Sequence, residues 1–387
     1  QLAIAPAGSG KTTAMSALSR SWVEAGGTVL GIAPSAAAAA GLGEQLAGDT
    51  DTLAKLIWDL QHGAAAPWKR RIGPKTLVVI DEAGMADTLS LDAAVDFVLQ
   101  RGGSVRLIGD DQQLAAIGAG GVLRDIQASH GALRLTELRR FSNPAEGMAS
   151  LSLRQGETAA LGFYLDQRRI HVGDETTMAD DLFAAWSADR TGGLDSIMLA
   201  PTRELVADLN RRARAQRLGD TAAGRTVDLP DGNLASAGDT VIARLNKRSL
   251  KLTATDWVKN GDRFEVVKVH RSGAIRAKHL QTGRHIVLPA DYVGEQVELG
   301  YACTTHTAQG VTVDTMHGLL TGTESRQQAY TMLTRGRDAN HAYVVVVGDG
   351  DEHTVIRPET LNPLSPTDML ERILARDESP VSATTQL

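Results

Sequence analysis

Short apolar runs alternate with amphipathic stretches along the first third of the chain. Four short, largely apolar runs predict strands at residues 2–5, 29–33, 77–80 and 105–108. Residues 12–25 carry apolar side chains on one helical stripe, an Ala-rich helix is expected to follow the second strand, and residues 91–99 repeat the helical pattern. Continuous apolar strands that alternate with helices are typical of a parallel sheet covered on both faces. The pattern therefore predicts an α/β domain.

The pattern changes twice after residue 133. A second α/β series is expected there, with a helix, a strand and a long basic helix at residues 148–153, 196–199 and 202–218. Short strands of period two then alternate with Gly-containing turns, which predicts a small β-barrel or meander. The α/β pattern resumes afterwards, with further elements at residues 301–304, 313–319, 325–334 and 342–347.

These changes predict four parts of the chain. We expect a first domain over residues 1–132, a second domain over residues 133–225 and 300–350, a β-barrel insertion over residues 226–299, and a tail over residues 351–387. One helix is expected in the tail at residues 367–376, and the last residues are expected to be disordered. Residues 61–75, which include Trp68, predict a surface loop or hairpin, with a protruding DNA-separating pin as the alternative.

Composition and charge narrow the class of protein. An apolar share of 42% in 387 residues suffices for two or three buried cores, and no run approaches the roughly eighteen apolar residues of a membrane span. Cys303 is the only cysteine, which fits a reducing cytosol. Because the chain begins at Gln1 on its first strand, we expect it to be an excerpt of a longer polypeptide.

The net charge of −6 hides one basic segment. Residues 241–285 contain eleven basic residues, beginning with Arg244 and Lys247, and three acidic ones, so that this segment carries 11 − 3 = +8 and the remainder −14. Such a segment is compatible with an ordinary solvated face or with a polyphosphate partner. Trp257 and Tyr292 within the insertion are candidates for stacking on bases, with a place in the core as the alternative.

The first thirteen residues, QLAIAPAGSGKTT, predict a strand, a glycine-rich turn and a helix. Backbone N–H groups of such a loop point at a phosphate chain, and the helix N-terminus adds to the attraction. The sequence therefore predicts an ATP site made by Ala7, Gly8, Ser9, Gly10, Lys11, Thr12 and Thr13. Lys11 would reach the β- and γ-phosphates and Thr12 would hold Mg²⁺. Ala5 replaces the first consensus glycine, at little cost if its φ is negative; an exposed Gly/Ser turn is the alternative.

Asp81 and Glu82 follow the apolar strand at residues 77–80. A carboxylate there can hold Mg²⁺ through water, and its neighbour can orient or deprotonate the attacking water; an ordinary charge pattern at a helix start is the alternative. Hydrolysis also needs donors near the γ-phosphate. Gln113, Arg140 and Arg335 are candidates, although arginines at helix ends commonly pair with carbonyls or acids.

The order of these motifs resembles that of superfamily 1 helicases over nearly the whole chain. The matching pieces are GSGKTT, APSAAAA, VVIDEAGM, LIGDDQQL, TELRRF, YACTTHTAQG and AYTMLTRGR. The resemblance is greatest to the RecD-like, 1B branch, in particular to the helicase region of MobF-type conjugative relaxases. It implies two RecA-like P-loop domains with parallel sheets, of which the second carries an SH3-like barrel that binds single-stranded DNA. It also implies ATP-driven 5′→3′ movement on single-stranded DNA.

The resemblance assigns roles residue by residue. Lys11 and Thr12 would bind phosphates and Mg²⁺, Asp81 would bind Mg²⁺, Glu82 would activate water and Gln113 would sense the γ-phosphate. Arg140, from the second domain, and Arg335 would be arginine fingers. The residues implied in DNA binding or coupling are Pro34, Ser35, Thr305, His306 and Gln309, with Arg244 and Lys247 in the insertion. Other conjugation or relaxosome proteins are possible partners.

Three positions depart from the family pattern: Ala5, Asp111 where Pro is usual, and Thr307 where a basic residue often follows the histidine. No histidine cluster of a nicking domain is present in the sequence. Alternatives to the motor are a nucleotide-dependent DNA-binding module that does not unwind and a RecD-like repair helicase. A GTPase or a small-molecule kinase is disfavoured, because Asn246-Lys247-Arg248-Ser249 lacks the Asp of a guanine-reading motif.

Overall fold

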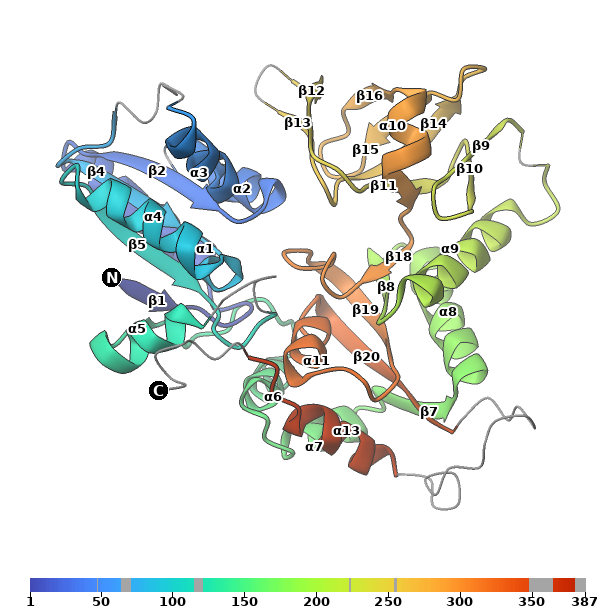
Figure 1. Ribbon diagram of the computed structural model, residues 1–387. Coiled ribbons are helices and arrows are strands. Elements are labelled where there is room, and N and C mark those ends of the chain that lie inside the picture. The colour runs from blue at the N-terminus through green and yellow to red at the C-terminus, as the bar shows by residue number, and fades with distance from the viewer. Residues whose placement is uncertain are drawn as a thin grey trace. The chain divides into compact units, whose positions relative to one another are not determined.

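The computed structural model describes residues 1–46, 48–63, 71–114, 121–222, 224–253, 256–347 and 365–379 (Figure 1). Contacts divide the chain into two compact units. The first comprises Gln1–Ala160, Ser325–Thr334 and the described residues 377–379, and the second comprises Leu161–Glu324 and Arg335–Arg376. The predicted loop or pin around Trp68 and the last residues of the tail lie outside the described residues.

The first unit contains a six-stranded parallel sheet in the order β3-β2-β4-β5-β1-β6. Its strands are β1 (Leu2–Ile4), β2 (Thr28–Ala33), β3 (Thr50–Thr52), β4 (Thr76–Ile80), β5 (Ser104–Gly109) and β6 (Leu133–Arg134). All five residues of β4 are buried, as expected of a central parallel strand. Because parallel strands end at one edge of the sheet, the residues after β1, β4 and β5 lie at the same edge.

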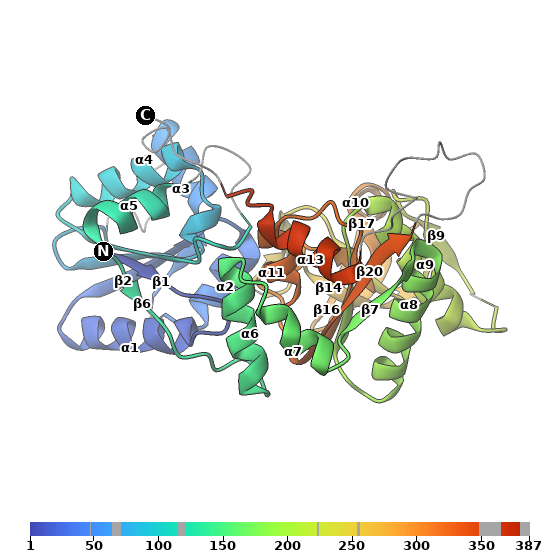
Figure 2. The ribbon, with the colours of Figure 1, turned by 90° about the horizontal axis from the view of Figure 1, so that it is seen from below.

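Helices cover both faces of this sheet. They are α1 (Lys11–Glu24), α2 (Ala36–Gly43), α3 (Leu53–Gln61), α4 (Thr88–Leu99) and α5 (Val122–His130), with the short 3₁₀ helix η2 (Ala83–Met85) after β4. Buried side chains of α1 and α2 pack in one core on one face of the sheet, and those of α3, α4 and α5 pack in a second core on the other face. Figure 2 shows α1 opposite α4 and α5. The predicted α/β class is confirmed.

The segment from residue 133 to residue 160 corrects the predicted domain boundary. β6 pairs with β1, and this segment, including α6 (Pro144–Gln155), belongs to the first unit and not to the second. Helix α11 (Arg326–Met332), predicted within the second domain, also belongs to the first unit. Both β6 residues are exposed, so that no apolar run marks the strand in the sequence.

The second unit has a five-stranded parallel sheet in the order β18-β8-β19-β20-β7. Its elements are α7 (Ala160–Asp166), β7 (Ile170–Asp174), α8 (Glu175–Thr191), β8 (Ser196–Ala200), α9 (Arg203–Leu218), β18 (Ala302–Thr304), β19 (Val313–Leu320), β20 (Gly336–Val347) and α13 (Pro366–Ala375). Apolar side chains of α8 and α9 pack on the sheet. The predicted helix in the tail is confirmed as α13, whereas β7 and α8 were not predicted.

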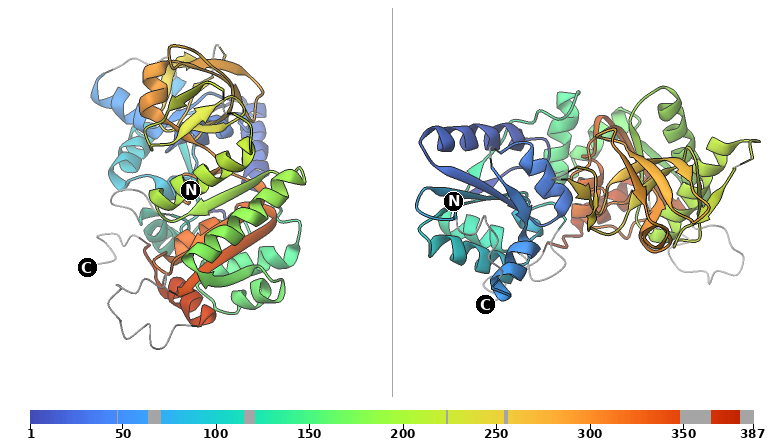
Figure 3. Two further views of the ribbon diagram at one scale, coloured as in Figure 1. Left: turned by 90° about the vertical axis from the view of Figure 1, so that its right-hand side faces the viewer. Right: turned by 90° about the horizontal axis from the view of Figure 1, so that it is seen from above.

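An antiparallel insertion interrupts the second unit between α9 and β18. Its elements are β9 (Thr226–Asp228), β10 (Leu234–Ser236), β11 (Thr240–Ala243), β12 (Lys247–Lys251), β13 (Trp257–Val258), β14 (Arg263–Val269), β15 (Ile275–His279), β16 (His285–Leu288), α10 (Ala290–Gln296) and β17 (Val297–Leu299). Five strands form one sheet, β16-β15-β14-β11-β17. Figure 3 shows these strands, yellow to orange, gathered together. Their buried apolar side chains form one core. The likeness to an SH3-like barrel stays a prediction.

Within the described part of the chain, no helix combines the length and the apolar character needed to cross a membrane.

Candidate functional site

The loop between β1 and α1 has the geometry of an anion site. Gly8 and Gly10 have φ of +80° and +75°, and a Cβ on Gly8 would lie 2.6 Å from the Cβ of Arg140. Gly10 precedes α1, whose N-terminus has no side-chain cap and no acidic residue in its first turn. The Ser9 hydroxyl is buried and has no hydrogen-bond partner among the described residues. Unpaired donors at a helix N-terminus fit phosphate oxygens.

Lys11 lies between two carboxylates that follow β4. Its Nζ is 2.9 Å from Asp81 Oδ1 and 2.6 Å from Glu82 Oε1. Burial alone would lower the pKa of Lys11, but these carboxylates raise it above its usual value. Burial raises the pKa of Asp81, and Lys11 opposes this effect. The structure therefore brings together the three charged groups predicted at the nucleotide site.

Glu82 has a left-handed backbone, with φ of 50° and ψ of 36°. Its N–H donates to Asp81 Oδ1 at 2.8 Å. A left-handed conformation is costly for a residue other than glycine, and strain of this kind gathers at functional sites. Ala5, in contrast, is not among the described residues with positive φ, so that its replacement of the consensus glycine needs no strained backbone, as expected.

Arg140 lies beside the phosphate loop, within the first unit. The N–H of its neighbour Arg139 donates to the Gly8 carbonyl at 2.7 Å, and the Arg140 guanidinium donates to the carbonyl of Thr334 at 2.9 Å. The expectation that Arg140 comes from the second domain is therefore wrong, because β6 ties its segment to the first sheet. Its role as an arginine finger stays a prediction.

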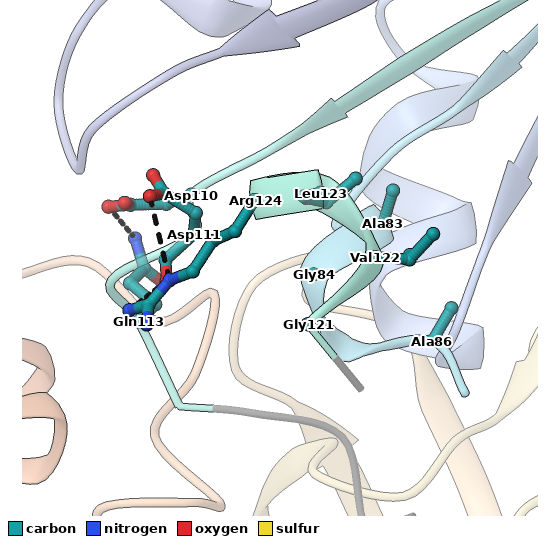
Figure 4. Close-up of a pocket in the computed structure, with 10 residues that line it drawn as sticks. All are labelled: Ala83, Gly84, Ala86, Asp110, Asp111, Gln113, Gly121, Val122, Leu123 and Arg124. Atoms are coloured by element: carbon teal, nitrogen blue, oxygen red, sulfur yellow. Dashed lines mark hydrogen bonds and ion pairs between the residues drawn. The ribbon is translucent and has the colours of Figure 1, made fainter. Parts of the chain in front are cut away.

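Gln113 follows β5 in a charged network (Figure 4). Its Nε2 donates to Asp110 Oδ2 at 3.2 Å, and Asp110 also accepts from Arg154 Nε at 2.9 Å. Arg154 Nη2 reaches Asp111 Oδ1 at 2.5 Å, so that the residue that replaces the usual proline takes part in an ion pair. A pocket adjoins the network and is lined by Ala83, Gly84, Ala86, Asp110, Asp111, Gln113, Gly121, Val122, Leu123 and Arg124.

Arg335 lies in the second unit, directly before β20. Its side chain is only 2% exposed, and Nη1 donates to the Val311 carbonyl at 3.4 Å. Burial of a guanidinium is compatible with a structural arginine and with a charge held ready for a ligand. The predicted role of Arg335 therefore stays a prediction.

The residues predicted to contact DNA differ in exposure. In the first unit Pro34 is half-buried, and the Ser35 hydroxyl caps α2 by accepting from Ala38 N–H at 3.1 Å. In the second unit His306 and Lys247 are exposed, whereas Thr305 is buried. The exposed residues are thus the ones whose side chains can meet a ligand without rearrangement.

Arg244 joins the insertion to the segment that carries Thr305, His306 and Gln309. It donates to Thr307 Oγ1 at 3.1 Å, and its Nε lies 3.3 Å from Glu298 Oε2. A cation therefore stands beside Thr307, the position where the family often has a basic side chain. The Nε2 of Gln309 is buried and lacks a hydrogen-bond partner among the described residues.

Three residues of the hydrogen-bonded network around Asp110 were not predicted: Tyr330, Asp110 and Arg154. The Tyr330 hydroxyl accepts the Ala7 N–H at 3.0 Å and donates to Asp110 Oδ2 at 2.9 Å. Tyr330 and Asp110 lie in the motifs AYTMLTRGR and LIGDDQQL, which were the available signal. Arg154 has no such signal, because it lies in an ordinary helical pattern.

The aromatic candidates of the insertion are also placed. Tyr292 is buried and donates its hydroxyl hydrogen to the Leu245 carbonyl, so that the core interpretation is correct for it. Trp257 is half-buried, and the Arg248 guanidinium lies 4.8 Å from its ring centroid.

Comparison with known proteins shows what the chain is similar to. Residues 1–175 match a family model described as an AAA domain. The chain is 30% identical over 340 residues to a probable conjugal transfer protein TraA of Sinorhizobium fredii, covering 87% of this chain and 30% of that protein. It is 28% identical over 357 residues to the ATP-dependent RecD2 DNA helicase of Deinococcus radiodurans, covering 86% and 45%. The chain thus spans less than half of either relative.

The fold resembles that of a solved helicase. The Pif1 helicase from Bacteroides in complex with ADP-AlF3 and ssDNA matches with a TM-score of 0.56 and 19% identity, covering 93% of this chain and 91% of that one. Together these comparisons confirm the resemblance predicted from the motifs. In sequence and in fold the chain is similar to the RecD-like, superfamily 1B helicases, and it resembles the helicase regions of conjugative relaxases.

Proposed function

We propose that this chain is an ATP-driven motor that moves 5′→3′ along single-stranded DNA and separates duplex strands, as the helicase part of a conjugative relaxase. The observation that carries the proposal is the grouping of Lys11, Asp81 and Glu82 beside an uncapped helix N-terminus. The conjugal transfer relative and the RecD2 helicase support the assignment to DNA transfer and unwinding.

In this proposal the first unit binds the nucleotide. The loop amides and Lys11 hold the phosphates, while Thr12 and Asp81 hold Mg²⁺, which would neutralise charge on the phosphate oxygens when bound. Glu82 accepts a proton from the attacking water, because its carboxylate is freed once Lys11 turns to the phosphates. Gln113 reports the state of the γ-phosphate to the Asp110 network.

The two arginines supply positive charge during hydrolysis. Arg140 already lies beside the loop in the first unit, and Arg335 belongs to the second unit. Donors placed where charge develops lower the barrier, and an arginine finger is worth about 10³–10⁵ in turnover.

The insertion is proposed to hold single-stranded DNA. Eight of its basic side chains are exposed: Lys247, Arg248, Lys251, Lys268, Arg271, Arg276, Lys278 and Arg284. Lys268 on β14 pairs directly with Arg276 on β15. Like charges directly opposite each other on a sheet are unfavourable unless an anion lies near them. A phosphate backbone would supply that anion, with a strong dependence on salt.

A strand-displacement assay with 5′-tailed and 3′-tailed duplexes tests the proposal. We expect unwinding of the 5′-tailed substrate only, ATPase stimulation by single-stranded DNA, and the loss of both in Lys11→Ala. Unwinding from the 3′ tail would refute the polarity. DNA binding without stimulated hydrolysis would favour the module that does not unwind, and near-normal turnover in Lys11→Ala would refute the nucleotide site.

A further inference from the structure

Tyr330 is a buried tyrosine whose hydroxyl reaches the phosphate loop. The residue is 1% exposed and lies in α11. Its hydroxyl accepts from the Ala7 N–H at 3.0 Å and donates to Asp110 Oδ2 at 2.9 Å. One side chain therefore joins Ala7, the residue directly before Gly8, to the Asp110 carboxylate that follows β5.

The partners of Asp110 make this connection firm. Asp110 accepts from Arg154 Nε, from Gln113 Nε2 and from the Gln112 N–H at 2.9, 3.2 and 3.1 Å. Burial raises the pKa of Asp110 while Arg154 opposes this effect, and burial also raises the pKa of Tyr330. Because its pKa is raised, the Tyr330 hydroxyl keeps its proton for donation to Asp110 while it accepts from Ala7.

The loop needs such an external support. Gly8 and Gly10 have positive φ, and glycine peptides are intrinsically free to change conformation. Inside the loop the Ser9 N–H donates to the Pro6 carbonyl at 3.1 Å, while Arg139 N–H and Tyr330 hold it from other segments. If the Tyr330 hydroxyl were removed, the Ala7 N–H and one oxygen of Asp110 would each lose a buried partner.

The residues directly before and after the α11 segment belong to the second unit. Ser325–Thr334 belongs by its contacts to the first unit, whereas Glu324 before it and Arg335 after it belong to the second. Ser325 and Gln328 form a capping box that fixes the start of the helix, and the Thr334 hydroxyl donates to the Tyr330 carbonyl at 2.9 Å. Tyr330 and Arg335 are five positions apart in the chain.

We propose that Tyr330 is a positioning residue that fixes the phosphate loop and couples it to α11, the segment that leads into Arg335. This inference rests on the proposed function, because it needs the loop to bind ATP. A shift of the loop on binding or releasing phosphate acts on the Tyr330 hydroxyl and, through α11, on the start of the Arg335 segment. Tyr330 does not touch the reacting atoms in this scheme.

Tyr330→Phe tests the inference, since it deletes the hydroxyl and keeps the ring. We expect the KM for ATP to rise about ten-fold, the size expected when a buried hydrogen bond of the binding loop is lost, and the stimulation of kcat by single-stranded DNA to fall at least three-fold. Tyr343→Phe is the matched control: it deletes another buried tyrosine hydroxyl, 3.1 Å from His317 Nδ1 in the second unit. It should leave KM and stimulation unchanged.

Several outcomes separate the explanations. A lowered melting temperature with a KM within two-fold of the parent would mean that Tyr330 is only structural, which overturns the inference. If Tyr330→Phe does not fold, Asp110→Asn weakens the same connection, and an unchanged KM in that variant also overturns it. Absence of ATP hydrolysis in the unsubstituted chain would instead refute the proposed function.

Discussion

Arg154→Met should destabilise the first unit strongly, because it leaves a buried carboxylate without its cation. The side chain of Asp110 is 1% exposed and that of Arg154 is 10% exposed. The guanidinium lies 2.9 Å from Asp110 Oδ1 and 2.5 Å from Asp111 Oδ1. Met has nearly the length of Arg and can occupy the same space, so that the change removes the charge more than the volume.

The expected loss follows from this burial. Removing one partner of a buried ion pair costs about 3–5 kcal/mol, since the remaining charge cannot return to water. In a unit of this size each kcal/mol lowers the melting temperature by about 2–4 °C, so that the drop should be about 6–20 °C. Arg71→Met is the matched control, because the Arg71–Asp49 pair is at least half exposed and should be worth less than about 1 kcal/mol.

Thermal unfolding followed by circular dichroism measures both variants. The double variant Arg154→Met with Asp110→Asn removes the unpaired charge and should recover part of the loss. Acidification should narrow the gap between parent and Arg154→Met, because loss of the cation raises the pKa of Asp110 further and a protonated carboxyl needs no counter-charge. A drop no larger than that of Arg71→Met, or a gap that widens at low pH, would refute the reasoning.

Three further predictions concern turnover, backbone strain and pH. Arg335→Ala should keep ATP binding in a titration and cut steady-state turnover by about 10³–10⁵; loss of the folded signal would show that Arg335 is structural. Glu82→Gly should melt higher than Glu82→Ala by the equivalent of about 1 kcal/mol, because glycine accepts φ of 50° without strain; equal melting temperatures would argue against strain. Burial lowers the pKa of His341 to about 3, so that the unfolded chain binds more protons below about pH 6.5. The second unit should thus keep its full stability above that pH and lose about 2 kcal/mol of unfolding free energy between pH 6.5 and 5. Melting temperatures measured across this pH range should depend less on pH in His341→Phe than in the parent. The control His285→Phe, at an exposed histidine, should keep the pH dependence of the parent.

Local sequence pattern was sufficient to predict that Lys11, Asp81 and Glu82 lie together. In the sequence, one apolar strand leads into a glycine-rich turn and another leads into two acidic residues. The carboxyl ends of parallel strands lie at the same edge of a sheet, so these two segments are expected to be close together. Lys11, Asp81 and Glu82 therefore meet as expected. The loop and the central strands were predictable because each is encoded within about ten consecutive residues.

The domain boundary and the Tyr330 network were not predictable in this way. β6 consists of two exposed residues at the edge of the sheet. Its sequence therefore contains no apolar run that would predict a strand. The contact of Tyr330 with Ala7 spans 323 positions, and no periodicity records such a distance. Helix α10 is seven residues long, too short for its period to stand out among strands.

Asp81 and Glu82 neutralise the charge of Lys11 within the protein. An arriving anion must therefore displace two internal carboxylates, and its affinity is the difference between two sets of charge pairs rather than the strength of one.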